Sequence, residues 1–124
     1  MRPVLALILV AVLAACGGPG LPERPDSFAT TDTMLADSVA LDSRNRFEQA
    51  VVGHSLRGEG VDVVVAPGGV LVGTQYGRPF NGAWIYRRGR FCYALEDRVT
   101  RRNARCFHAA VVGRTVHLVP VSRD

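Results

Sequence analysis

Hydrophobic and polar residues alternate with a period of two through most of the second half of the chain. Four valine- and aromatic-rich stretches carry this pattern, at residues 61–67, 69–76, 81–96 and 104–120. The two longer stretches each contain a central turn signal, Arg88-Gly89 in one and Gly113-Arg114 in the other. The pattern therefore predicts about six short strands joined by tight turns. We expect a mainly β fold, in which a small antiparallel meander curls into a barrel or half-barrel.

One segment before these strands has helical spacing instead. Its apolar side chains share one helical face, and they are Phe47, Ala50 and Val51. Asp42 or Ser43 supplies an N-cap, and Gly53 stands where a helix would end. These signals predict one short N-terminal helix over residues 43–52, which would plug the barrel.

The first residues of the chain follow neither pattern. After Arg2, residues 4–13 are apolar without interruption, and glycine and proline follow directly after Cys16. A charged start before an apolar run of about ten residues is typical of a secretory signal. A membrane-spanning helix needs roughly 20 apolar residues, so this run is too short to cross a bilayer. The sequence therefore predicts an exported protein with a signal peptide over residues 1–15.

The end of the apolar run, Leu13-Ala14-Ala15-Cys16, resembles the lipobox of bacterial lipoproteins. The resemblance implies cleavage before Cys16 and acylation of its thiol; the alternative is an ordinary signal peptide that ends in Ala-Ala-Cys. A tether over residues 16–41 would then lead to one small domain over residues 42–121. Because Gly17 is not the aspartate that often retains such proteins in the inner membrane, the resemblance favours the outer membrane, facing the periplasm.

Acylation of Cys16 would leave Cys92 and Cys106 as a pair. An oxidising periplasm permits a disulfide between them, and closing a loop of this length contributes about 3 kcal/mol in the chain-entropy model. If the two cysteines face each other on paired strands, Phe91 faces Phe107. One face of this hairpin is then apolar except for Arg105, which lies near the loop end.

Charge is distributed unevenly along the chain. All 15 basic residues are arginine, against 11 acidic residues. Residues 17–75 have a net charge of −4, whereas residues 76–124 have a net charge of +7. Two arginine clusters flank the first cysteine strand, and the candidate anion-binding residues are Arg87, Arg88, Arg90, Arg98, Arg101, Arg102 and Arg105. They form one stripe, two separate patches or a merely solvated surface, and the sequence leaves these alternatives open.

The sequence contains no convincing catalytic or metal-binding motif. His54 and Ser55 precede Asp62, but no nucleophile-elbow motif surrounds the serine. The histidines and cysteines lack the spacing of metal ligands. A single tryptophan on a strand, Trp84, favours a core anchor over a ligand platform. We therefore expect no enzymatic activity, no metal and no cofactor.

The second half of the chain also resembles small exported proteobacterial domains of unknown function. A G-x-W, G-x-x-C and second-cysteine pattern carries the resemblance, at Gly82, Trp84, Gly89, Cys92 and Cys106. It covers about residues 45–118, and the long charged loop 96–105 departs from it. The resemblance implies a small β domain and no particular activity.

Together these features predict a lipid-anchored cell-envelope protein with a binding or structural role. The alternative is a small-barrel inhibitor of an envelope or periplasmic hydrolase, because exported inhibitors are similarly small, disulfide-bonded β proteins. We expect attachment to the membrane through Cys16 and contact with an anionic lipid or glycan. Export argues against a nucleic-acid partner, and the sequence identifies no protein partner.

Overall fold

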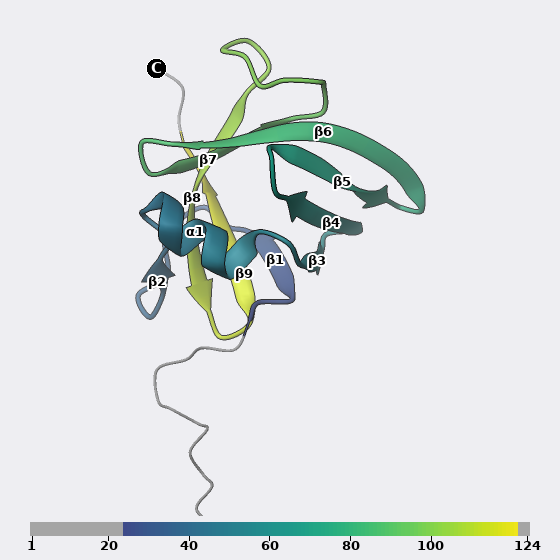
Figure 1. Cartoon of the computed structure of the whole chain (residues 1–124). Helices are drawn as coiled ribbons and strands as arrows, with labels where there is room; N and C mark the ends of the chain where they lie inside the picture. The colour runs from purple at the N-terminus through teal and green to yellow at the C-terminus, as the bar shows by residue number, and fades with distance from the viewer. Residues whose placement is uncertain (1–23, 122–124) are drawn as a thin grey trace, which may run out of the picture.

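The computed structural model describes residues 24–121 of the 124-residue chain as a β-barrel with one short helix (Figure 1). The elements in chain order are β1 Ser27–Thr30, β2 Val39–Ala40, α1 Arg44–Val51, β3 Ser55–Gly58, β4 Val61–Ala66, β5 Val70–Gln75, β6 Arg78–Arg87, β7 Arg90–Ala94, β8 Arg105–Val112 and β9 Thr115–Pro120.

The strands between Arg24 and Val121 form a single nine-stranded sheet that closes on itself. Its order is β2-β8-β7-β6-β5-β4-β3-β1-β9, and β8 also pairs with β9. This last pairing closes eight strands into a barrel, and the short β2 adds to the flank of β8. Strands β3 to β9 form an antiparallel meander, whereas β1 runs parallel to both of its neighbours, β3 and β9.

The predicted mainly β fold with one short helix is confirmed, and of the two predicted forms, barrel and half-barrel, the structure shows the closed barrel. The predicted number of strands is too low. The six predicted strands correspond to β4–β9, and α1 lies within the predicted range with Ser43 as its N-cap. No strand is expected from the sequence at β3, which has one buried apolar side chain, Leu56. Residues 24–41 fall within the predicted tether, 16–41, yet they supply β1 and β2. Barrel closure depends on β1, because β1 joins β3 to β9.

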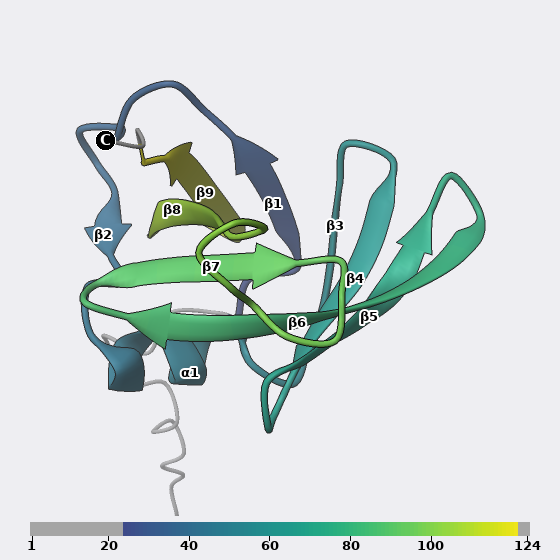
Figure 2. The ribbon, with the colours of Figure 1, turned by 90° about the horizontal axis from the view of Figure 1, so that it is seen from above.

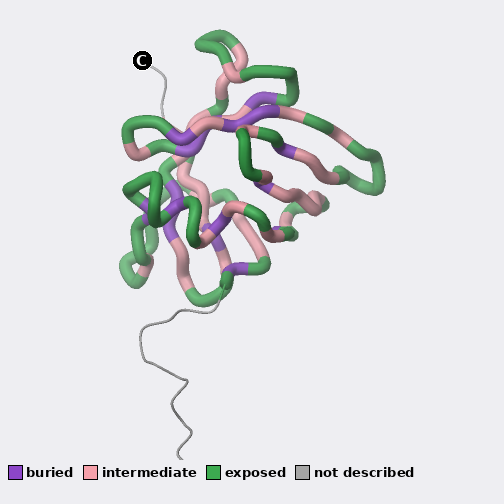
Figure 3. The backbone as a smooth tube through the Cα atoms, in the orientation of Figure 1, coloured by how far each residue is buried: buried purple, intermediate pink, exposed green. Residues whose placement is uncertain are grey.

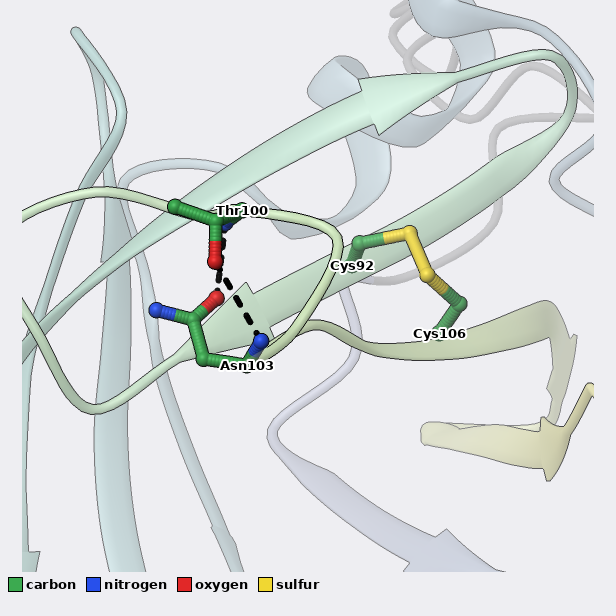
Figure 4. The surroundings of a disulfide bond; sticks show 4 residues. All are labelled: Cys92, Thr100, Asn103 and Cys106. Carbon is green, nitrogen blue, oxygen red and sulfur yellow. Dashed lines mark hydrogen bonds between the residues drawn. A yellow bond between two sulfur atoms is a disulfide. The ribbon is translucent and has the colours of Figure 1, made fainter. Parts of the chain in front are cut away.

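The disulfide between Cys92 and Cys106 is confirmed, together with the register that it predicts. The cysteines are direct partners on β7 and β8, and Phe91 pairs with Phe107. Figure 4 shows the bond joining the two strands just before the loop that connects them. The disulfide therefore fixes the wall of the barrel next to Tyr93 and Arg105, which are also direct partners.

Two interior glycines allow β5 and β6 to bend tightly enough for the barrel to close. Gly73 of β5 and Gly82 of β6 have the same inward orientation as the core residues that alternate with them. A Cβ at Gly73 would overlap the carbonyl oxygen of Asp62, and a Cβ at Gly82 would overlap that of Ala94. Such close backbone approach marks a barrel corner. It also leaves the interior without side chains at these two positions.

Candidate ligand-binding site

One end of the barrel is closed by α1. Phe47 and Val51 of the helix are buried, and Phe47 is only 1% exposed. The Phe47 ring centroid lies 5.8 Å from that of Trp84, 5.1 Å from that of Tyr86 and 5.1 Å from that of Phe91. Aromatic contacts at this spacing add to the burial of apolar area. Figure 3 shows buried segments in α1, β6 and β7, and further ones on other strands of the barrel.

The indole and hydroxyl groups buried at this closed end have hydrogen-bond partners. The Trp84 indole N–H donates to the Ala66 carbonyl at 2.7 Å, and the Tyr86 hydroxyl donates to the Leu41 carbonyl at 2.9 Å. Burial raises the pKa of Tyr86, and the nearby Asp42 carboxylate raises it further, while Arg44 acts in the opposite direction. Trp84 is therefore a core residue, as the sequence predicts.

Above this core lies a cavity of about 290 Å³. Its apolar lining comes from almost every strand of the barrel and includes Phe28, Leu56, Val61, Val63, Val65, Leu71, Phe80, Phe91, Tyr93, Phe107, Val116 and Leu118. Phe47 and Val51 form its floor. The sequence does not predict this cavity, because alternation shows which side chains point inward but not whether they fill the interior.

The cavity opens at the end of the barrel opposite α1, which we call the mouth. Strands β1, β3, β5, β7 and β9 run toward the mouth, and the β3–β4 turn, the β5–β6 turn and the β7–β8 loop surround it. In Figure 2 the β5–β6 turn and the β6–β7 turn lie at opposite sides of the molecule, and α1 lies beside the latter. Leu95 at the mouth is 54% exposed although it lines the cavity.

Few polar side chains line the mouth. They are Thr30, Glu59, Gln75 and Arg105. Glu59 accepts two hydrogen bonds from Thr30, one from the backbone N–H at 2.8 Å and one from the hydroxyl at 3.2 Å. Arg105 follows the alternation of β8 and lies on the inward face with Phe107. No ion pair or hydrogen bond of its guanidinium is found within residues 24–121.

The β7–β8 loop beside the mouth is held by its own hydrogen bonds. The Asn103 amide donates to Glu96 at 2.7 Å and to the Arg98 carbonyl at 3.0 Å. Asn103 also exchanges hydrogen bonds with Thr100 in both directions, as Figure 4 shows. This network presents three exposed candidate anion-binding residues, Arg98, Arg101 and Arg102.

The other arginine cluster lies elsewhere. Arg87, Arg88 and Arg90 are exposed at the β6–β7 turn, on the α1 side of the barrel. The two clusters therefore form separate patches at opposite ends of β7, not one stripe. Arg105 belongs to neither patch, because its side chain lines the cavity. Whether these arginines bind anions stays a prediction.

The remaining candidate residues form no catalytic arrangement with His54. Ser55 donates directly to the Asp62 carboxylate at 2.8 Å, and Arg57 pairs with the same carboxylate at 3.4 Å. The Nε2 atom of His54 is buried and has no hydrogen-bond partner in the described part of the chain. His54 therefore does not bridge Ser55 and Asp62. In residues 24–121 no group of three His, Cys, Asp or Glu side chains is placed to hold a metal ion.

Comparison with protein-family models, with curated proteins and with solved structures finds no match for this chain. Over the described range, no helix has the length and apolar character needed to span a bilayer. Cys16 and the rest of the lipobox lie outside the described residues. The site is therefore interpreted from its own geometry, and the lipobox resemblance stays a prediction.

Proposed function

We propose that this protein is a lipid-anchored binding module of a bacterial cell envelope, whose barrel takes a small ligand with an apolar body. The observation that carries this proposal is the apolar cavity of about 290 Å³, which has a closed floor and an open mouth. The mouths of β-barrels are common sites for small ligands, and eight-stranded barrels have room for one.

The volume of the cavity indicates the size of the ligand. An engineered apolar cavity of about 150 Å³ binds benzene, and this cavity is about 290 Å³. A medium-length alkyl chain or a two-ring aromatic group is therefore of suitable size. Each methylene that leaves water contributes about 0.8 kcal/mol, which is about fourfold in affinity.

The position of the N-terminal segment supports a defined orientation on the membrane. The backbone N–H of Asp26 donates to the Arg114 carbonyl at 2.9 Å, so the chain enters the domain beside the β8–β9 turn at the α1 end. A short connection from an acylated Cys16 would hold this end toward the bilayer. The mouth would then open into the periplasm and receive ligand from there.

A series of straight-chain alcohols tests the proposed function on the mature chain, residues 16–124, prepared without acyl groups. Calorimetry should show affinity rising about fourfold per methylene until the chain fills the cavity. Val63→Phe should block binding, because Val63 lines the cavity opposite Gly73. Val64→Phe is the matched control, since Val64 is the next residue of β4 and does not line the cavity.

The variants are first compared by circular dichroism and thermal melting, so that only folded proteins enter the titrations. Binding that Val63→Phe removes and Val64→Phe retains supports the proposal. If no alcohol binds the folded wild-type chain, or if both variants bind equally well, the interior is not a ligand site and the proposal is wrong.

A further inference from the structure

Among the described residues, one cationic side chain lines the mouth of the cavity, and it has no ion-pair partner there. Arg105 lines the cavity and is exposed. Its strand partner is Tyr93, whose ring stacks on that of Phe107 with centroids 5.9 Å apart. The guanidinium therefore extends from the edge of an aromatic wall. No carboxylate of residues 24–121 forms an ion pair with it.

The acidic residue of the mouth does not offset this charge. Both carboxylate oxygens of Glu59 accept hydrogen bonds from Thr30. Glu59 belongs to the turn between β3 and β4, whereas Arg105 is the first residue of β8. Around the shorter side of the closed sheet, two strands, β9 and β1, lie between β8 and β3. Because the barrel has eight strands, Glu59 and Arg105 lie on nearly opposite sides of the mouth.

We propose that the ligand is an amphiphile with one anionic head group. Its carboxylate or phosphate binds Arg105, and its apolar body occupies the cavity. This inference rests on the proposed function and specifies its ligand class. A guanidinium presents a planar fork of donors that suits both head groups. At the mouth, the head group keeps part of its hydration, so the large cost of burying a charge does not arise.

The exposed arginines of the β7–β8 loop favour the same ligand class. Arg98, Arg101 and Arg102 stand beside the mouth, and the hydrogen bonds of Asn103 hold the loop in shape. The same loop carries Glu96 and Asp97, so the three arginines leave it with a net charge of +1. These arginines raise the local concentration of anions beside the mouth. Their effect should therefore decline with added salt more steeply than the contact with Arg105.

Three probes with the same alkyl chain test the inference: octan-1-ol, octanoate and octyl phosphate. The mature wild-type chain should bind either or both anionic probes about tenfold more tightly than octan-1-ol, because hydrogen bonds to charged groups are stronger than neutral ones. Arg105→Gln should abolish this preference and leave octan-1-ol affinity within about twofold of wild type. Arg87→Gln is the matched control, because it removes an exposed arginine that lies at the other end of β7 and does not line the cavity.

The outcomes separate this inference from the proposed function. An anionic preference that Arg105→Gln removes and Arg87→Gln keeps supports the assignment of Arg105. If wild type binds all three probes equally, or if Arg105→Gln keeps the preference, the head-group assignment is wrong although the cavity still binds apolar chains. If none of the probes binds folded wild type, the proposed function itself fails.

Discussion

The two ends of this barrel are stabilised in different ways. At the α1 end, Phe47 packs against three aromatic rings and the buried indole and hydroxyl groups are hydrogen-bonded. At the mouth, the stabilising features are local: the Cys92–Cys106 disulfide, the Asn103 network and the contacts of Glu59 with Thr30. A small domain that concentrates its packing at one end and cross-links the other can keep an open interior between them.

The largest difference between the ends should appear on truncating one side chain at each. Phe47→Ala should lower the free energy of unfolding by about 3–5 kcal/mol, because it leaves a cavity in the closed core. Leu95→Ala at the mouth should change the free energy of unfolding by no more than about 0.5 kcal/mol, since surface substitutions rarely change it more. Urea denaturation of both variants measures the two effects. Equal losses would show that packing energy is spread evenly along the barrel.

Removing the disulfide should have the next largest effect. The double variant Cys92→Ala/Cys106→Ala should lose about 3 kcal/mol, because the unfolded chain regains the freedom of the closed loop. Thermal melting with and without a reducing agent measures this loss. The double variant is its own control, since a reducing agent should not lower its melting temperature further. An unchanged wild-type melting temperature on complete reduction would contradict the role assigned to the cross-link.

The two exposed arginine patches should differ in their attraction to an anionic membrane. Each surface arginine contributes about 1 kcal/mol near such a membrane at low salt. The β6–β7 turn has no acidic residue, whereas the β7–β8 loop carries Glu96 and Asp97. Replacing Arg87, Arg88 and Arg90 by serine should therefore weaken binding of the unacylated chain to anionic vesicles more than the same change at Arg98, Arg101 and Arg102.

Vesicle sedimentation across a salt series measures this difference, with neutral vesicles as the control. Binding of both triple variants should be lost as salt rises, because the Debye length falls to about 8 Å at physiological ionic strength. A loop variant that binds less than the turn variant would reverse the assignment. Vesicle binding by neither wild type nor variants would leave both patches as solvated surface.

The smallest expected effect concerns the titration of tyrosine. Burial and Asp42 raise the pKa of Tyr86 above its usual value of 10.0, so the folded state holds this proton more tightly than the unfolded state does. Its contribution to stability is therefore complete below pH 10 and is lost as pH rises through the folded-state pKa. Ultraviolet titration of wild type and Tyr86→Phe should identify Tyr86 as a late-titrating hydroxyl. If Tyr86→Phe instead removes a hydroxyl that titrates before those of the other tyrosines, the raised pKa of Tyr86 is contradicted.

Local signals in the sequence predict the hairpins but not the closure of the barrel. The helix follows from its cap and spacing, and the β7–β8 register follows from the cysteines together with the apolar face of the hairpin. The same register singles out Arg105 as the one charged residue on that face. By contrast, β1 has only four residues. It forms a strand because its backbone pairs with both β3 and β9, which lie far from it in the sequence.

The cavity also lies beyond what local pattern predicts. Val63 and Leu71 alternate as core residues would, yet they line open space because Gly73 and Gly82 supply no side chain to fill it. Interior volume depends on barrel size and on side chains from all of its strands together. A pattern read one strand at a time does not contain that information.

Methyl-labelled NMR of the mature chain, titrated with octanoate, shows directly whether the interior of the barrel takes an apolar chain through the mouth. Shifts should concentrate on the cavity-lining methyl groups of Val63, Leu71 and Leu118. The outward methyl groups of Val64 and Val72, on the same strands as Val63 and Leu71, should remain unchanged. Shifts that are confined to outward methyl groups, or that are absent at saturating octanoate, would show that the interior is not the binding site.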